Sequence, residues 1–182
     1  MGVMAMENGM TAGRCARTTI ITLFMMCFLG LFGVSANAGE LSVLLNGKAI
    51  HLDSQSGVTY NENNWGVGFQ YGMKPVEEKW VPFATASGFK DSNKNTSYYF
   101  GGGFLHRTSF EWGKTPMHFD AGGIVFLMKR KGFRNGDLFP GILPAVSLGT
   151  PRVAVNMTFI PKIDPKMVPL LFFQLKITLG DF

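Results

Sequence analysis

A carboxylate and a hydroxyl stand side by side at Asp91 and Ser92, in the stretch GFKDSNKN where an apolar run ends and a polar loop begins. Turns use the same residue types, because Asp, Ser and Asn side chains bond to the local backbone. With a histidine such as His51, however, the set would supply the hydroxyl, base and orienting carboxylate of an acyl-transfer site. The alternative is that His51 and Asp91 are ordinary polar groups. The choice depends on whether the fold brings them together.

The chain that must position these residues is a succession of short runs rich in aromatic and β-branched residues, separated by Gly, Pro, Asn and Asp clusters. Such runs predict strands. Eight are expected, at 41–51, 64–72, 78–89, 96–107, 118–128, 142–149, 152–160 and 168–179. Between them, 108–117 is predicted to be a long loop and 149–151 a short turn.

Several runs alternate with a period of two, as in WGVGFQY (65–71), RVAVNMTF (152–159) and LFFQLKITL (171–179). One face is apolar and the other polar or small, which is typical of strands. A soluble barrel or sandwich would turn the apolar face inward, whereas an outer-membrane barrel turns it toward lipid.

The even strand count, the run length and the apolar last strand favour the membrane version. We therefore predict an all-β fold, an eight-stranded antiparallel up-and-down transmembrane β-barrel. Phe182 is out of phase with the last strand unless a bulge near Gly180 corrects it.

Up-and-down strands also predict which residues share a rim. The ends of the first, third, fifth and seventh runs meet at one end of the barrel, the outer one if both termini are periplasmic. This end would gather His51, Asp91 with Ser92, the basic segment KRKGFR (129–134) and Pro161. The three residues needed for acyl transfer are therefore expected at one membrane interface.

The N-terminal segment has the features of a secretory signal peptide. Arg14 and Arg17 precede an apolar run at 18–34, and small residues follow at Ala36 and Ala38. Residues 1–38 are predicted to be cleaved, which leaves one outer-membrane barrel domain at 39–182. A retained membrane anchor is the alternative.

Composition limits the partners. The net charge of +5 falls by one with removal of the leader, and the remaining charge is not concentrated. Nucleic acid is therefore a poor partner, and a basic rim facing anionic lipid fits better. Both cysteines, Cys15 and Cys27, lie in the leader. A disulfide scaffold is excluded.

Four stretches resemble the lipid A palmitoyltransferase family (the PagP type), eight-stranded outer-membrane barrels that acylate lipid A. They are YNENNWGVGF (60–69), GFKDSNKN (88–95), ILPAVSLG (142–149) and NMTFIP (156–161). The second is similar to the family's FKDS stretch. Together the matches run from Tyr60 to Pro161.

The resemblance implies that Asp91 and Ser92 are catalytic, with His51 as the third catalytic residue. The implied reaction transfers a palmitoyl chain from the sn-1 position of a phospholipid to a hydroxyl on lipid A, without a metal or other cofactor. The expected partners are the phospholipid donor and the lipid A acceptor in the outer membrane, with the protein acting as a monomer. Which residue acts as the base stays open.

Three further residues are assigned to the substrate by the resemblance. Gly103 falls at the family's acyl-length-determining glycine, and Pro144 and Pro161 fall at prolines that flank lateral openings for lipid. The residues themselves allow other interpretations. A strand glycine also occurs at bulges, and prolines occur at strand ends and edges.

The chain departs from the family pattern in two places. No amphipathic helix fits ahead of the first strand, because only Gly39 and Glu40 precede it after the leader. The basic loop at 129–134 also differs, and is either a phosphate contact or a solvated loop. Two other functions stay open: a non-catalytic barrel that binds lipid or supports the envelope, and a secreted soluble barrel for an apolar ligand.

Overall fold

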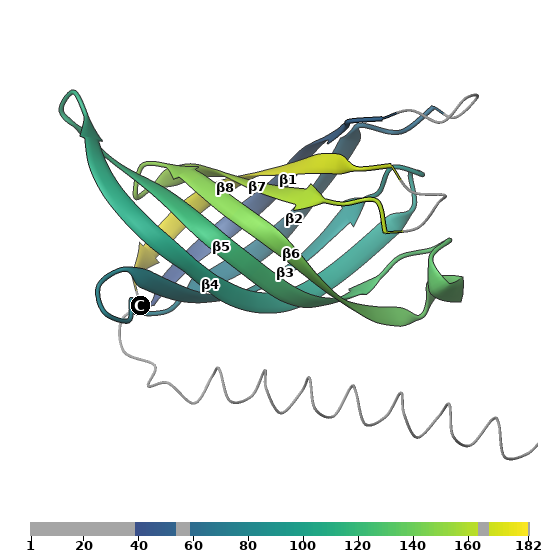
Figure 1. Cartoon of the computed structure of the whole chain (residues 1–182), viewed down its shortest axis with the longest axis horizontal. Helices are drawn as coiled ribbons and strands as arrows, with labels where there is room; N and C mark the ends of the chain where they lie inside the picture. Colours follow the sequence, from purple (N-terminus) through teal and green to yellow (C-terminus); the bar gives the residue numbers. More distant parts are fainter. Residues whose placement is uncertain (1–38, 54–58, 164–167, 182) are drawn as a thin grey trace, which may run out of the picture. The chain divides into compact units, whose positions relative to one another are not determined.

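The computed structural model describes residues 39–53, 59–163 and 168–181, so the predicted leader at 1–38 lies outside it. The strands are β1 (Glu40–His51), β2 (Asn63–Gly72), β3 (Trp80–Lys90), β4 (Thr96–Trp112), β5 (Thr115–Lys129), β6 (Leu138–Gly149), β7 (Val153–Ile160) and β8 (Leu170–Asp181). A short 3₁₀ turn, η1 (Arg134–Gly136), precedes β6. Figure 1 shows the strands in sequence around the barrel.

The strands form a closed barrel in sequence order, and β1 pairs with β8 to complete it. Each neighbouring pair is antiparallel. The predicted eight-stranded up-and-down barrel is therefore confirmed. No helix in the described part of the chain is long and apolar enough to cross a membrane.

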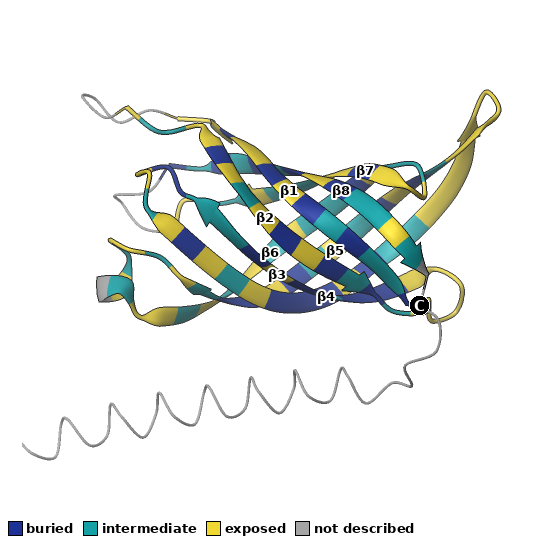
Figure 2. Cartoon of the chain, turned by 180° about the vertical axis from the view of Figure 1, so that it is seen from behind, coloured by how far each residue is buried: buried dark blue, intermediate teal, exposed yellow. Residues whose placement is uncertain are grey.

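Side-chain exposure along the strands has the opposite sense to that of a soluble barrel. In β2, Trp65 and Phe69 are 68% and 54% exposed, whereas Asn64 and Gln70 are 2% and 8% exposed. Exposed and buried bands alternate along the strands in Figure 2. Water would penalise such an apolar exterior, while lipid favours it. This arrangement decides between the two architectures in favour of the transmembrane barrel.

The expected long loop at 108–117 is wrong. β4 and β5 continue as a paired hairpin arm as far as Trp112 and Thr115, and only Gly113 and Lys114 form the turn. Gly113 has a positive φ of 65°, which a glycine adopts without strain. The Gly113–Lys114 turn and Pro116 made this stretch look like a loop, and its strand residues are exposed on both faces, so none had to be apolar.

β6 begins at Leu138, earlier than predicted, and one of its edges is only partly paired. It pairs with β5 over its whole length, but with β7 only from Ala145 to Gly149. Pro144 stands where the pairing with β7 stops, since proline has no N–H to donate. The segment from Leu138 to Pro144 is therefore without a β7 partner in the ladder.

The last strand contains the irregularity that the phase of Phe182 required. Leu41 pairs with Gly180, while the next residue, Ser42, pairs with Thr178, so Leu179 is skipped. This register shift is a bulge next to Gly180, the irregularity named above as the one that would correct the phase of Phe182. The side chain of Phe182 lies outside the described residues.

The two ends of the barrel differ in chemistry. The terminus end, where Glu40 pairs with Asp181, contains two partly buried ion pairs. Arg107 makes two hydrogen bonds to Asp120, at 3.0 and 2.9 Å, and Lys176 Nζ lies 3.4 Å from Glu40. The opposite end, called the site end below, carries His51 and Ser92. Its interior is lined mainly by aromatic and aliphatic side chains.

Candidate active site

The site end brings His51 and Ser92 into direct contact. His51 is the last residue of β1, and Ser92 follows β3 in the turn that leads to β4. His51 Nε2 lies 3.0 Å from Ser92 Oγ, within hydrogen-bond distance. Residues far apart in the sequence thus make a contact of the kind that joins nucleophile and base in acyl-transfer sites.

The segment before β2 holds the two sides of this contact together. The backbone N–H of Asn61 donates to the carbonyl of Ser92 at 2.8 Å, and its side-chain amide donates to the carbonyl of Asp91 at 3.1 Å. The carbonyl of Glu62 accepts a hydrogen bond from the N–H of Ala49, near the end of β1, at 2.9 Å. The segment therefore bridges β1 and the turn.

An aromatic ring orients the imidazole of His51. The rings of His51 and Tyr60 are stacked, with centroids 4.5 Å apart and an angle of 17° between their planes. Within the described residues, Nδ1 of His51 is buried and has no hydrogen-bond partner. The contacts found here thus fix the ring by stacking on one face and by the bond to Ser92.

The Asp91 carboxylate is buried, with 2% exposure, and anchors the turn. Its Oδ1 accepts hydrogen bonds from the backbone N–H groups of Asn93 and Asn95, both at 2.9 Å. Its Oδ2 accepts from Ser97 Oγ at 3.2 Å and from Arg130 Nε at 3.1 Å. The interpretation of GFKDSNKN as a turn is therefore confirmed, and the turn also carries the candidate serine.

The expected contact between an orienting carboxylate and His51 is not found among the described residues. The two Asp91 oxygens are directed to the turn, to Ser97 and to Arg130. Sequence reasoning placed Asp91 on the correct rim but could not give the direction of its side chain. The structure therefore pairs His51 with Ser92, and pairs Asp91 with Arg130.

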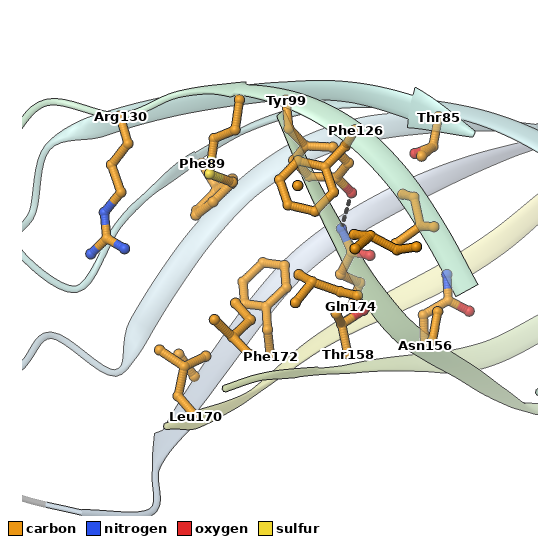
Figure 3. A pocket seen from close by; sticks show the side chains of 18 of the residues that line it. Thr85, Phe89, Tyr99, Phe126, Arg130, Asn156, Thr158, Leu170, Phe172 and Gln174 are labelled. Atoms are coloured by element: carbon orange, nitrogen blue, oxygen red, sulfur yellow. Dashed lines mark hydrogen bonds between the residues drawn. The ribbon is translucent and has the colours of Figure 1, made fainter. Parts of the chain in front are cut away.

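An apolar cavity of about 350 Å³ opens beside this pair, a size within the usual range for ligand pockets. Its walls include Phe83, Phe89, Phe126 and Phe172, and Ser92 also lines it. Figure 3 shows aromatic and aliphatic side chains gathered around this space. An enclosure of this character is suited to a hydrocarbon chain.

A polar layer lies among the residues that line the cavity toward the terminus end. Gln174 Nε2 donates to the hydroxyl of Tyr99 at 3.0 Å, and also to Asn46. Asn156 Nδ2 lies 3.4 Å from Gln70 Oε1. An acyl chain would gain little by passing beyond these groups, because displacing buried hydrogen bonds costs free energy.

Gly103 has a different environment from that expected of an acyl-length determinant. It is buried in β4, but it is not among the described residues that line the cavity. A Cβ built at this position would strike the backbone carbonyl oxygen of Gly123 in β5. The glycine thus allows β4 and β5 to approach closely, as a bulge or corner glycine does.

The two prolines flank the partly paired edge between β6 and β7. Pro144 is where the β6–β7 pairing stops, and Pro161 follows the last residue of β7. Pro161 lines the cavity, as do Leu143 and Ile160 from the two sides of this edge. A lateral connection between the cavity and the lipid phase would fall here.

Three residues of the site were not singled out from the sequence, although Arg130 lies in the basic segment that was expected at this rim. Tyr60 stacks on His51, and Arg130 binds Asp91. Asn64 lines the cavity with its Oδ1 buried and unpartnered within the described residues. Asn64 and Gln70 share a phase of β2, so the alternation itself could have indicated that Asn64 is inward. No group of three or more His, Cys, Asp and Glu residues in the described ranges could hold a metal ion.

The closed barrel, its apolar exterior and its apolar cavity define the class, a small transmembrane β-barrel with space for a lipid chain. The family model described as antimicrobial peptide resistance and lipid A acylation protein PagP matches residues 36–174. The chain therefore belongs to the PagP family, which confirms the resemblance in the four sequence stretches.

Solved structures of two outer-membrane barrels are similar to this chain. Neisserial surface protein A shares 12% identity and has a TM-score of 0.46, with 78% of this chain and 95% of that chain covered. Ail, the attachment invasion locus protein of Yersinia pestis, shares 12% identity and has a TM-score of 0.43, with 81% of this chain and 100% of that chain covered. No curated protein sequence matches the chain significantly.

Proposed function

We propose that this protein is an outer-membrane acyltransferase that moves a palmitoyl chain from a phospholipid to a hydroxyl of lipid A. The observation that carries the proposal is the hydrogen-bonded pair of His51 and Ser92, 3.0 Å apart, beside an apolar cavity. Membership of a lipid A acylation family supports the acceptor. Palmitate as the acyl group is part of the proposal, as are His51 and Ser92 as the reacting pair and Asp91 as the residue that anchors the turn carrying Ser92.

The proposed reaction has two acyl transfers. Ser92 Oγ attacks the ester carbonyl of the phospholipid while His51 Nε2 accepts the hydroxyl proton. The tetrahedral intermediate collapses, and the departing lysophospholipid oxygen takes that proton from His51. A lipid A hydroxyl then attacks the acyl-serine, His51 accepts the hydroxyl proton, and the released Ser92 oxygen takes it back. The acyl chain has moved and the enzyme is regenerated.

The partly paired edge between β6 and β7 is proposed as the lipid entrance. A closed β-ladder would oblige a long acyl chain to enter from the aqueous end of the barrel. Pro144 and Pro161 flank an edge where few backbone bonds must be broken, and Pro161 also lines the cavity. With the site end facing outward, donor and acceptor would both reach His51 and Ser92 at the outer interface.

The proposal is tested by transfer in reconstituted vesicles. Purified protein is mixed with a phospholipid carrying isotope-labelled palmitate at sn-1 and with lipid A, and both lipids are followed by mass spectrometry. Label should appear on lipid A together with the matching lysophospholipid. Ser92→Ala and His51→Ala should abolish the transfer, because each removes one side of the pair.

Asn93→Ala is the matched control, since Asn93 is an exposed residue of the same turn whose backbone N–H, rather than its side chain, binds Asp91. It should retain wild-type transfer. The proposal is wrong if wild-type protein moves no label, or if Ser92→Ala and His51→Ala are as active as wild type. That second result would favour a lipid-binding barrel without catalysis at this pair.

A further inference from the structure

The end of β5 and the segment after it carry four cationic residues at the site end. Between residues 129 and 137 the chain contains Lys129, Arg130, Lys131 and Arg134, with Asp137 as the one acidic residue. Two of these cations, Arg130 and Arg134, line the cavity together with Ser92. A mainly apolar cavity thus has two guanidinium groups on the side where the candidate serine lies.

Arg130 is held in place by its carboxylate partner. Its Nε donates to Asp91 Oδ2 at 3.1 Å, and its side chain is 23% exposed while that of Asp91 is 2% exposed. This is the single side-chain hydrogen bond found for Arg130 among the described residues, and within them its two terminal nitrogens make none. In Figure 3 the guanidinium lies across the cavity from Gln174 and Asn156, away from the polar layer.

The chemistry of the guanidinium identifies the ligand class. Arginine presents a planar fork of donors that matches the oxygens of a phosphate, and such bonds are stronger than those between neutral groups. An acyl chain in the cavity with its ester at Ser92 leaves its polar headgroup at the same end as Arg130. A membrane lipid with a phosphate close to its ester has this arrangement of parts.

We propose that Arg130, assisted by Arg134, is a phosphate-binding subsite at the mouth of the acyl cavity, and that Asp91 is the positioning residue that holds Arg130 there. The inference deepens the proposed acyltransferase function and rests on it for the identity of the bound lipid. Phosphate could be carried by the phospholipid donor or by lipid A. Both present the same oxygens to the guanidinium, and the experiment separates them.

The test compares Arg130→Gln with Lys129→Gln. The two changes remove one positive charge at neighbouring positions, but Lys129 is exposed and does not line the cavity. Three rates are measured: transfer from a phospholipid, transfer to lipid A with and without its phosphates, and hydrolysis of p-nitrophenyl palmitate, a palmitoyl ester without phosphate. The last rate reports whether His51 and Ser92 are intact.

Arg130→Gln should raise KM for the phosphate-bearing substrate at least about tenfold, the effect of one lost hydrogen bond to a charged group. Hydrolysis of the neutral ester should stay within about twofold of wild type, because this substrate has no phosphate for Arg130 to bind. Arg130→Lys should recover part of the loss, and Lys129→Gln should change neither rate. A larger KM for the phospholipid identifies the donor phosphate, whereas an effect that disappears with dephosphorylated lipid A identifies the acceptor phosphate.

Equal losses on phosphate-bearing and neutral substrates would overturn the inference, because Arg130 would then act only by supporting the turn of Ser92. Unchanged rates on all substrates would overturn it as well. Binding gives an independent readout by ³¹P NMR with short-chain phosphatidylglycerol. Wild type should bind it more tightly than Arg130→Gln does, even if no acyl group reaches lipid A. Failure of the proposed function is thereby distinguished from failure of the phosphate subsite.

Discussion

Asp91→Asn separates two roles for the buried carboxylate. The amide keeps an oxygen at the Oδ1 position for the N–H groups of Asn93 and Asn95, and the Ser97 hydroxyl can rotate to donate or to accept. Only the Arg130 contact is lost, because an amide N–H₂ cannot accept from Arg130 Nε. The expected loss of folding free energy is that of one hydrogen bond to a charged group, about 1.5–3 kcal/mol.

The assay combines unfolding in detergent with two substrates. Asp91→Asn should lower stability by about 2 kcal/mol, weaken use of the phosphate-bearing substrate, and leave hydrolysis of p-nitrophenyl palmitate largely unchanged. Asp91→Ala should destabilise the protein more, since all four side-chain bonds are lost. An orienting carboxylate predicts the reverse: kcat for the neutral ester lower by about 10⁴ with stability unchanged. That outcome would refute the positioning role.

Three further predictions concern the barrel. Phe69→Lys, on the exposed face, should lower the free energy of unfolding in bilayers by about 2–4 kcal/mol. Unchanged stability of this variant in unfolding experiments would contradict the orientation of the strand. Gly103→Ala should lower the free energy of unfolding by about 1–3 kcal/mol, because the added methyl group forces β4 away from β5. A shorter transferred acyl chain at unchanged stability would instead support the acyl-length role. Glu40→Gln should lower the free energy of unfolding by about 3 kcal/mol, because Lys176 is left unpaired. Adding Lys176→Met should recover most of this loss. If denaturant titrations show no recovery, the ion pair does not stabilise the fold.

The topology could be predicted well from the sequence, because successive residues of a barrel strand face lipid and the barrel interior in turn. The alternation around Trp65 and Phe69 required two different faces, and the strand order then placed His51 and Ser92 on one rim. Both follow from backbone geometry alone. The sequence indicated which face meets lipid only through the strand count, the run length and the apolar last strand. The exposure of Trp65 and Phe69 in the structure shows that the apolar face is the outer one.

Side-chain direction at the site could not be predicted in the same way. Strand counting placed both His51 and the basic segment on the same rim as Asp91, so either could have been the partner of its carboxylate. The choice of Arg130 depends on the turn bonds that fix the carboxylate and on the rotamer of a long side chain. The hairpin arm from Thr108 to Trp112 was missed for a different reason, since its residues are exposed on both faces and an arm of this kind buries no apolar face.

Mass spectrometry of lipid A from cells that express the protein, with Ser92→Ala expressed at the same level as the comparison, is the most direct measurement of the proposed function. Wild type should yield lipid A heavier by one palmitoyl group, and Ser92→Ala should yield lipid A without that addition. Lipid A of the same mass from both strains, with each protein folded in the outer membrane, would contradict acyl transfer at the His51–Ser92 pair.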